Sequence, residues 1–373
     1  MYSLQYKGWI GKVDEVWIKE ARTSIFSSLF QYYIKRITPG QKLFIGYDNN
    51  ISSQYLAEEA ANYFSENGLP VFISTRPLAT SMLQAITKER YGCGSLSFVV
   101  EDYKFPHVGL KASNMDGIFI APEDLTDLSS TAKHKKQTMD SFDPTLNLKN
   151  YIENNLNLST TSKPLQSLVW NAMHSPLSPI LEELFIEIFD KNSIDAYTIN
   201  SFENSIPKKS NINPDYQEEI EQTCIKLNSY HCNFGITTTS DLTNIDIVKK
   251  EKENITSVEF EDIIYRILPY LGYQENMIIS DDITFNASKK HPVNITKVSE
   301  GKFFGYIKEN SFSIAIDSEY NIYIHNELFP NHFAVLFCLF HSILYGKSKE
   351  HFSKSTISER KSKSKNSKTV TKQ

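Results

Sequence analysis

The alternation of short apolar runs with amphipathic helices limits the possible fold of this chain more than any other feature. Three apolar runs have the length of buried strands, at residues 42–47, 71–74 and 95–100. Segments of helical periodicity separate them, one rich in alanine after Ser52 and one at residues 80–91. This order is typical of an open α/β sheet, in which ligands bind beyond the carboxyl ends of the strands.

The same rhythm recurs in the rest of the chain. Further strands are expected at residues 167–171, 193–199 and 233–238. Polar residues dominate the stretch before them, which we interpret as a connecting helix and linker with little core. The predicted segments are residues 1–135, the linker at 136–165, a second unit at 166–256, a reduced third unit at 257–349 and a tail at 350–373.

Composition excludes several classes of protein. The chain has 373 residues, 40% of them hydrophobic and 22% charged, which is ordinary for two or three globular domains. A net charge of −5 gives no general attraction to nucleic acid, and the four cysteines form no CxxC pair that would indicate zinc. The chain shows no signal-peptide pattern and no apolar run of membrane-spanning length, so we expect a cytoplasmic protein without a membrane partner.

The tail has a composition of its own. Residues 350–373 are rich in lysine and serine and poor in apolar residues, which predicts a disordered basic segment. Such a segment is either simply solvated or touches an acidic surface or nucleic acid. Because the charge of the whole chain is negative, a nucleic-acid partner is not expected.

Residues 99–111 follow the third predicted strand and read Val-Val-Glu-Asp-Tyr-Lys-Phe-Pro-His-Val-Gly-Leu-Lys. Upstream lie Gly-Tyr-Asp-Asn-Asn, Asn-Gly-Leu-Pro and Arg-Pro, and downstream lies Asp-Gly-Ile. This order closely resembles domain 1 of the α-D-phosphohexomutases, the phosphoglucomutase/phosphomannomutase family. The resemblance predicts an α/β protein of tandem αβα domains with mixed sheets.

The resemblance continues over roughly residues 5–349. The second unit has Asn-Ala-Met-His-Ser where the family has Asp-x-Met-His-Gly, and a strand that begins Gly-Ile. In the third unit, Glu309 and Ser311 match the family's Gly-Glu-x-Ser-Gly-His loop, but Phe312 and Ser313 replace its Gly and His. The family's fourth domain, which binds the substrate phosphate, has no counterpart that we can identify.

The resemblance implies phosphoryl transfer through an enzyme phosphoserine, which needs a nucleophile, a divalent cation and cationic phosphate clamps. Glu101 stands at the position of the serine in a loop of the same length. A glutamate carries charge but lacks the chemistry of the serine hydroxyl. The adjacent Asp102 has the chemistry to form an acyl phosphate; the alternative is that both are solvated loop carboxylates.

The metal loop of the family corresponds to residues 239–244. Three aspartates are needed there because Mg²⁺ prefers anionic oxygen, but this chain has Thr239, Asp241 and Thr243. We therefore expect no bound Mg²⁺ and no other cofactor. Arginines that clamp phosphate in the family are replaced as well, by Ile10, Asn50 and Asn244.

Four polar residues match positions where the family contacts its substrate. They are Lys111, His174, Glu309 and Ser311. Lys111 resembles a catalytic acid or base of the family, and the others resemble substrate-binding residues. Each also has a structural interpretation: a surface lysine, a hydrogen-bonded loop histidine, and solvated polar residues of a hairpin.

Two hypotheses about function follow. The first is a pseudoenzyme that keeps the phosphohexomutase scaffold and acts by binding a protein partner, a second copy of itself or, weakly, a sugar phosphate. The second is an active intramolecular phosphotransferase on hexose phosphates with altered residues. In that case Asp102 would accept the phosphoryl group, supported by Asp241 and Lys111.

Overall fold

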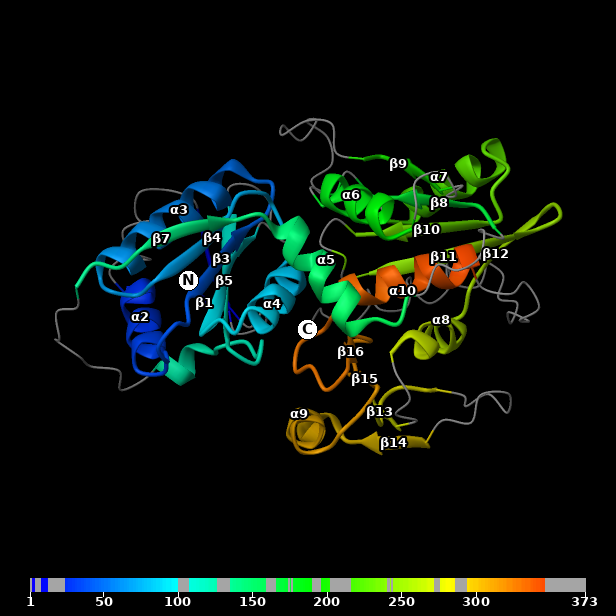
Figure 1. Cartoon of the computed structure of the whole chain (residues 1–373). Helices are drawn as coiled ribbons and strands as arrows, with labels where there is room; N and C mark the ends of the chain where they lie inside the picture. Colours follow the sequence, from blue (N-terminus) through cyan, green and yellow to red (C-terminus); the bar gives the residue numbers. More distant parts are fainter. Residues whose placement is uncertain are drawn as a thin grey trace, which may run out of the picture.

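The computed structural model describes residues 2–3, 8–12, 24–99, 107–125, 135–158, 166–173, 175, 177–189, 196–201, 216–239, 242, 244–271, 276–285 and 294–345. Within them the strands form three mixed sheets, each packed against helices (Figure 1). The predicted α/β class with mixed sheets is confirmed. Each sheet and its helices are called the first, second and third unit below.

The first unit holds a sheet of order β1-β2-β6-β5-β3-β4-β7. Its strands are β1 Tyr2–Ser3, β2 Gly8–Lys12, β3 Leu43–Tyr47, β4 Val71–Ser74, β5 Gly94–Val99, β6 His107–Asn114 and β7 Met139–Phe142. Its helices are α2 Phe26–Ile34, α3 Ile51–Glu66, α4 Thr80–Glu89 and the short 3-10 helix η3 Pro122–Leu125. Strands β3, β4, β5 and β7 run parallel, whereas β6 runs in the opposite direction and pairs antiparallel with both β5 and β2.

Helix α3 shows how the sequence specifies an element of this unit. The side chain of Asn50 accepts a hydrogen bond from the backbone N–H of Ser52 at 2.9 Å, which caps the first turn. Ala57, Ala60 and Phe64 recur at helical spacing and are completely buried. Gly68 follows the helix with a φ of +104°, a conformation that favours glycine, and the chain then turns toward β4.

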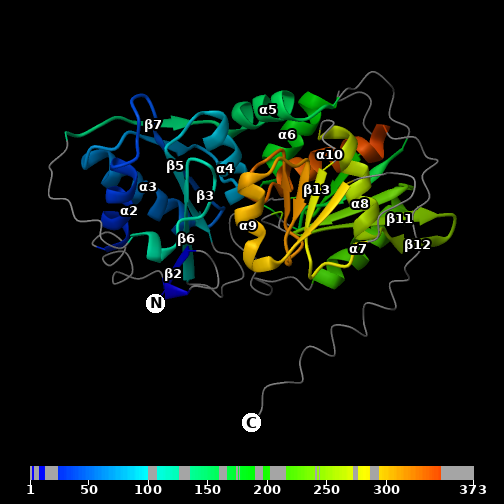
Figure 2. The same cartoon turned by 90° about the horizontal axis from the view of Figure 1, so that it is seen from below.

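The segment between the first and second units contains a strand and a helix. Strand β7 pairs with β4 and so extends the first sheet, and α5 spans Pro144–Asn155. Leu148, Tyr151 and Ile152 lie on one face of α5 and are at most 2% exposed. The expectation of little core in this segment is therefore wrong for α5, because Leu148 is separated from Tyr151 and Ile152 by two polar residues and the three form one face only on a helix. Figure 2 shows α5 running beside α4 and beside helix α6 (Ser178–Ile188) of the second unit.

The second unit holds a sheet of order β12-β11-β10-β8-β9. Its elements are β8 Leu168–Asn171, α6 Ser178–Ile188, β9 Ala196–Ile199, α7 Tyr216–Ser229, β10 Phe234–Thr238, β11 Ile245–Glu251 and β12 Asn254–Ser257. Strands β9, β8 and β10 are parallel, so their carboxyl ends meet at one edge. Antiparallel pairing then adds β11 and β12.

The third unit holds a sheet of order β14-β13-β15-β16. Its elements are α8 Phe260–Ile267, η4 Leu268–Tyr270, β13 Asn276–Ser280, β14 Asn294–Val298, α9 Glu300–Glu309, β15 Ile314–Ile316, β16 Ile322–Ile324 and α10 His332–Tyr345. Phe303, Phe312 and Tyr323 are at most 1% exposed and form a core between α9 and the sheet. This unit is therefore a folded sheet-and-helix layer.

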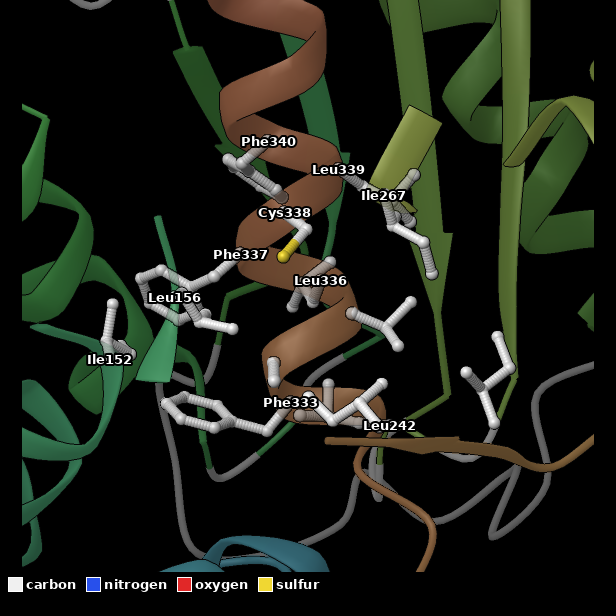
Figure 3. Packing of buried hydrophobic residues seen from close by; sticks show 14 of the residues in the cluster. Ile152, Leu156, Leu242, Ile267, Phe333, Leu336, Phe337, Cys338, Leu339 and Phe340 are labelled. Carbon is white, nitrogen blue, oxygen red and sulfur yellow. The ribbon is translucent and has the colours of Figure 1, made fainter. Parts of the chain in front are cut away.

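Helix α10 lies at the centre of the main core, between the second sheet and the third sheet (Figure 1). All its residues from His332 to Leu344 are buried. The ring of Phe340 stacks on that of Phe185 from α6, with centroids 4.1 Å apart. Figure 3 shows its aromatic and aliphatic side chains pointing in several directions around the helix. A helix that is apolar on all sides is a core helix, and no described helix is long and apolar enough to cross a bilayer.

Candidate functional site

The pairing of β5 with β6 places the loop that resembles the catalytic loop of the family. Val99 pairs with Gly109 and Ser97 pairs with Lys111, so residues 100–106 connect two antiparallel neighbours. The loop thus leaves the carboxyl end of β5, beside β3, whose following residue Asp48 donates its N–H to the carbonyl of Phe98 at 2.9 Å. Glu101 and Asp102 themselves lie outside the described residues.

Lys111 is held on the central part of β6. It is partly buried, and its Nζ lies 5.8 Å from the ring centroid of Phe119. The neighbouring strand fits closely here because a Cβ at Gly8 would lie only 2.6 Å from the carbonyl oxygen of Leu110. Lys111 is therefore set in the sheet at a fixed register rather than on an exposed loop.

Arg76 forms an ion pair that the sequence did not indicate. It follows β4, and its guanidinium makes two hydrogen bonds of 2.6 and 2.9 Å to the carboxylate of Glu183 on α6. The hydrogen bond to Glu183 raises the pKa of Arg76 above its ordinary value. This cation links the first unit to the second, and both of its parallel hydrogen bonds go to the carboxylate of Glu183.

The segment that resembles the metal loop is closed by its own backbone. Thr239 donates its N–H to the carbonyl of Asn244 at 3.1 Å, and its hydroxyl accepts the N–H of Asn244 at 2.9 Å. Asp241 and Thr243 lie outside the described residues. A turn with these bonds uses the Thr239 hydroxyl as a cap within the loop.

Leu242 anchors this loop in the core. Its side chain is 0% exposed, and Figure 3 shows it close to Phe333 of α10. Its backbone has a φ of +66°, which is unusual for a leucine and costs about 1–3 kcal/mol of strain. The burial of a large apolar side chain offsets such a cost.

The donor set of this loop does not fit Mg²⁺. The ion prefers several anionic oxygens in a near-octahedral arrangement. Thr239 offers a neutral hydroxyl that already accepts an N–H, and Asp241 is the one carboxylate in the sequence of the loop. We therefore assign no step of a reaction to a metal here.

The loop that resembles the sugar-binding loop of the family begins at the end of α9. Glu309 is the last residue of that helix, not part of a hairpin, and both Glu309 and Ser311 are exposed. Phe312 is 1% exposed in the core of the third unit, and its N–H donates to Oδ1 of Asn326 at 2.6 Å. Ser313 is also buried. The buried Phe312 and Ser313 thus fix the loop, and Glu309 and Ser311 remain accessible.

His174 lies outside the described residues, but its surroundings are informative. Asn171, at the end of β8, donates its side-chain amide to Oε2 of Glu219 at 2.9 Å, and Asn200 donates to the same oxygen at 2.9 Å. Glu219 is only 6% exposed, so these amides stabilise a buried carboxylate. An aspartate at 171, as in the family, would face Glu219 with like charge. Nothing local in the sequence pointed to this cluster.

The structure places the described candidates in three separate units. Lys111 is in the first sheet, Thr239 follows a strand of the second, and Glu309 and Ser311 belong to the third. Each candidate lies on or directly after an ordered strand or helix. A shared site would therefore be built from the faces of different units.

Comparisons with known proteins agree with this architecture. Residues 3–139 match the family model of the phosphoglucomutase/phosphomannomutase alpha/beta/alpha domain I. A phosphomannomutase-like protein from Thermus thermophilus superposes with a TM-score of 0.73 at 14% identity, over 93% of this chain and 81% of that one. A phosphoglucomutase/phosphomannomutase family protein from Burkholderia thailandensis gives 0.67 at 14% identity, over 91% and 77%.

A more distant structure shows the same fold. Parafusin, a phosphoglucomutase from Paramecium, has a TM-score of 0.58 at 13% identity, over 96% of this chain and 72% of its own. A comparison with curated proteins finds no match. The chain therefore has the fold of the phosphohexomutases, and its first unit is similar to domain I of the phosphoglucomutase/phosphomannomutase family.

Proposed function

We propose that this chain is a non-catalytic protein on a phosphohexomutase scaffold, which acts by binding a sugar phosphate between its first and third units. The observation that carries this proposal is the anchored metal loop. Leu242 is completely buried within it, and the Thr239 hydroxyl is bonded to the backbone of Asn244. These contacts keep the loop folded without a bound metal ion. They therefore support the proposal that the scaffold is kept while the metal chemistry of the family is not.

The accessible polar residues suit such a ligand. Lys111 supplies a point charge for a phosphate, although it lacks the fork of an arginine. Glu309 and Ser311 are exposed at the end of α9 and have the oxygen atoms that recognise sugar hydroxyls. We expect weak binding, because the arginines of the family are replaced at Ile10, Asn50 and Asn244.

A protein partner is the second candidate, supported by a separate observation. Ile51 is 82% exposed and Tyr55 is 48% exposed at the start of α3. They are one helical turn apart and so share a face next to the carboxyl end of β3. An exposed apolar pair at that edge suits a protein surface better than a phosphate.

Thermal unfolding with added ligands tests the proposal. We expect glucose 1-phosphate or glucose 1,6-bisphosphate to raise the melting temperature, and Mg²⁺ alone to leave it unchanged. A ligand at 100 times its Kd stabilises the folded state by about 2.7 kcal/mol. The matched control is Lys111→Met, which keeps the length of the side chain and should abolish the shift.

The other outcomes are equally decisive. A shift that requires Mg²⁺ would contradict the proposal, because it would mean that a metal site is present. No shift with either sugar phosphate would also reject it, and attention would pass to a protein partner on the face of Ile51 and Tyr55.

A further inference from the structure

A buried polar cluster joins the first and third units. Its centre is Glu327, which is 2% exposed in the connection between β16 and α10. Oε1 of Glu327 accepts the hydroxyl hydrogen bond of Tyr151 on α5 at 2.9 Å. Oε2 accepts the side-chain amide of Asn331 at 2.8 Å. Nζ of Lys88, at the end of α4, lies 3.5 Å from Oε1.

The same bonds begin helix α10. Asn331 is 0% exposed and donates also to the hydroxyl of Tyr151 at 2.7 Å. Its Oδ1 accepts the backbone N–H of Ala334, which caps the first turn of α10. A buried carboxylate that lost these donors would pay the full cost of desolvation. The cluster is therefore stable only while α4, α5 and the start of α10 stay together.

Helix α5 and the residue just after it also contact all three units through further polar bonds. On one side, Asn147 accepts a hydrogen bond from Arg90 at 2.7 Å, and Asn154 donates to Glu89 at 2.8 Å, both partners lying in the first unit. Lys149 pairs with Glu187 of α6 in the second unit at 2.9 Å. Just beyond the helix, Asn157 donates its N–H to the carbonyl of Tyr270 in the third unit at 3.0 Å.

We propose that α5 and the Glu327 cluster, together called the joint, couple the local unfolding of the first and third units. Weakening the joint should therefore increase local opening in both units. The cluster takes Lys88 from the first unit, Tyr151 from α5, and both Glu327 and Asn331 from the third unit. If the third unit moved away from α5, Glu327 and Tyr151 would lose their hydrogen bond, and if the first unit moved away, Glu327 would lose the Lys88 cation. The joint holds the two units at a fixed separation. This inference does not depend on the proposed function, since no residue of the cluster is among those proposed to bind a ligand.

A pair of matched substitutions tests the joint by amide hydrogen exchange. Tyr151 and Tyr323 are both buried, and each donates to a carboxylate at 2.9 Å, but the partner of Tyr323 is Asp317 within the third unit. We expect Tyr151→Phe to speed exchange about tenfold in both α4 and β16, the cost of one hydrogen bond to a charged group. Tyr323→Phe should speed exchange in the third sheet and leave α4 unchanged. Faster exchange on only one side of the joint in Tyr151→Phe would overturn the proposal.

A surface substitution guards against a variant that does not fold. The side chain of Lys88 is 43% exposed, so Lys88→Met should fold while it removes the cation that the first unit places beside Glu327. We expect faster exchange in β16 and in the first turn of α10, although the substitution is in α4. Unchanged exchange in both of these elements would show that Lys88 does not couple the units.

The pH dependence of Glu327→Gln adds an independent measurement. Charged or titratable groups near the cluster come from every element around it: Lys88 and Glu89 on α4, Tyr151 on α5, His325 after β16 and Cys338 on α10. Burial raises the pKa of Glu327 above its ordinary value, so the folded state holds the proton more tightly than the unfolded chain does. The contribution of Glu327 to stability is then complete below its unfolded pKa and declines as pH rises through the folded pKa.

The expected result is a difference that depends on pH. Relative to wild type, Glu327→Gln should become progressively more stable as pH is raised from about 4 toward neutral, since the amide does not titrate. His325 is present in both proteins, so its own titration cancels in the comparison. Urea denaturation over this pH range measures the difference, and a constant gap would show that folding does not raise the pKa of Glu327.

Discussion

Phe337→Ala is expected to lower the free energy of unfolding by about 3–5 kcal/mol, the range for removing a buried aromatic ring. Phe337 is 0% exposed on α10. Its ring centroid lies 4.8 Å from that of Phe185 on α6 and 5.0 Å from that of Phe333. Alanine would leave a cavity at the point where the second and third units share one core, and the surrounding helices can close it only partly.

The control is the same substitution at an exposed phenylalanine. Phe304 lies on α9 and is 43% exposed, so Phe304→Ala should cost less than about 1 kcal/mol. Urea denaturation followed by circular dichroism compares the two variants. Equal losses of stability would mean that α10 is not the centre of the core.

The second large effect is the absence of mutase activity. We expect the purified chain to leave glucose 1-phosphate and mannose 1-phosphate unchanged in the presence of Mg²⁺. Enzymes of ordinary efficiency accelerate reactions by at least about 10⁶-fold, and this acceleration depends on a nucleophile, a metal and phosphate clamps acting together. The resemblance to the family puts Glu101 where the serine is expected, and the loop at residues 239–244, with Thr239 and Leu242, has only one aspartate.

A trace of contaminating mutase is the main source of error in that assay. Lys111→Met, prepared in the same way, separates the two cases because a contaminant would give equal rates in both preparations. Turnover by the wild-type chain that Lys111→Met abolishes would establish an active enzyme and reject the proposed function.

The helices and strands that were predicted well from the sequence are those marked by local patterns of apolar and turn-forming residues. Residues 71–74 coincide with β4, and residues 80–91 contain α4, because apolar period and flanking Gly and Pro mark both. Strand β7 shows the limit of this reasoning. Its first three residues are exposed, so only its pairing with β4 makes it a strand.

The candidate site was predictable only in part, because local sequence patterns do not show which distant segments come together. The length of the preceding loop singled out Lys111, and the structure sets this residue on β6 opposite Ser97. Its role in a site stays a prediction. The burial of Leu242 had one signal, a leucine in an otherwise polar loop. The Glu327 cluster had none, since Lys88, Tyr151 and Glu327 are far apart in the sequence and each is ordinary in its own segment.

The most direct test of the central claim is the intact mass of the protein after incubation with glucose 1,6-bisphosphate and Mg²⁺. Catalysis as in the family requires a covalent phosphoenzyme, whereas binding does not. We predict that the mass stays that of the unmodified chain. A gain of one phosphoryl group would contradict the account, and its loss in Asp102→Asn would identify Asp102 as the acceptor.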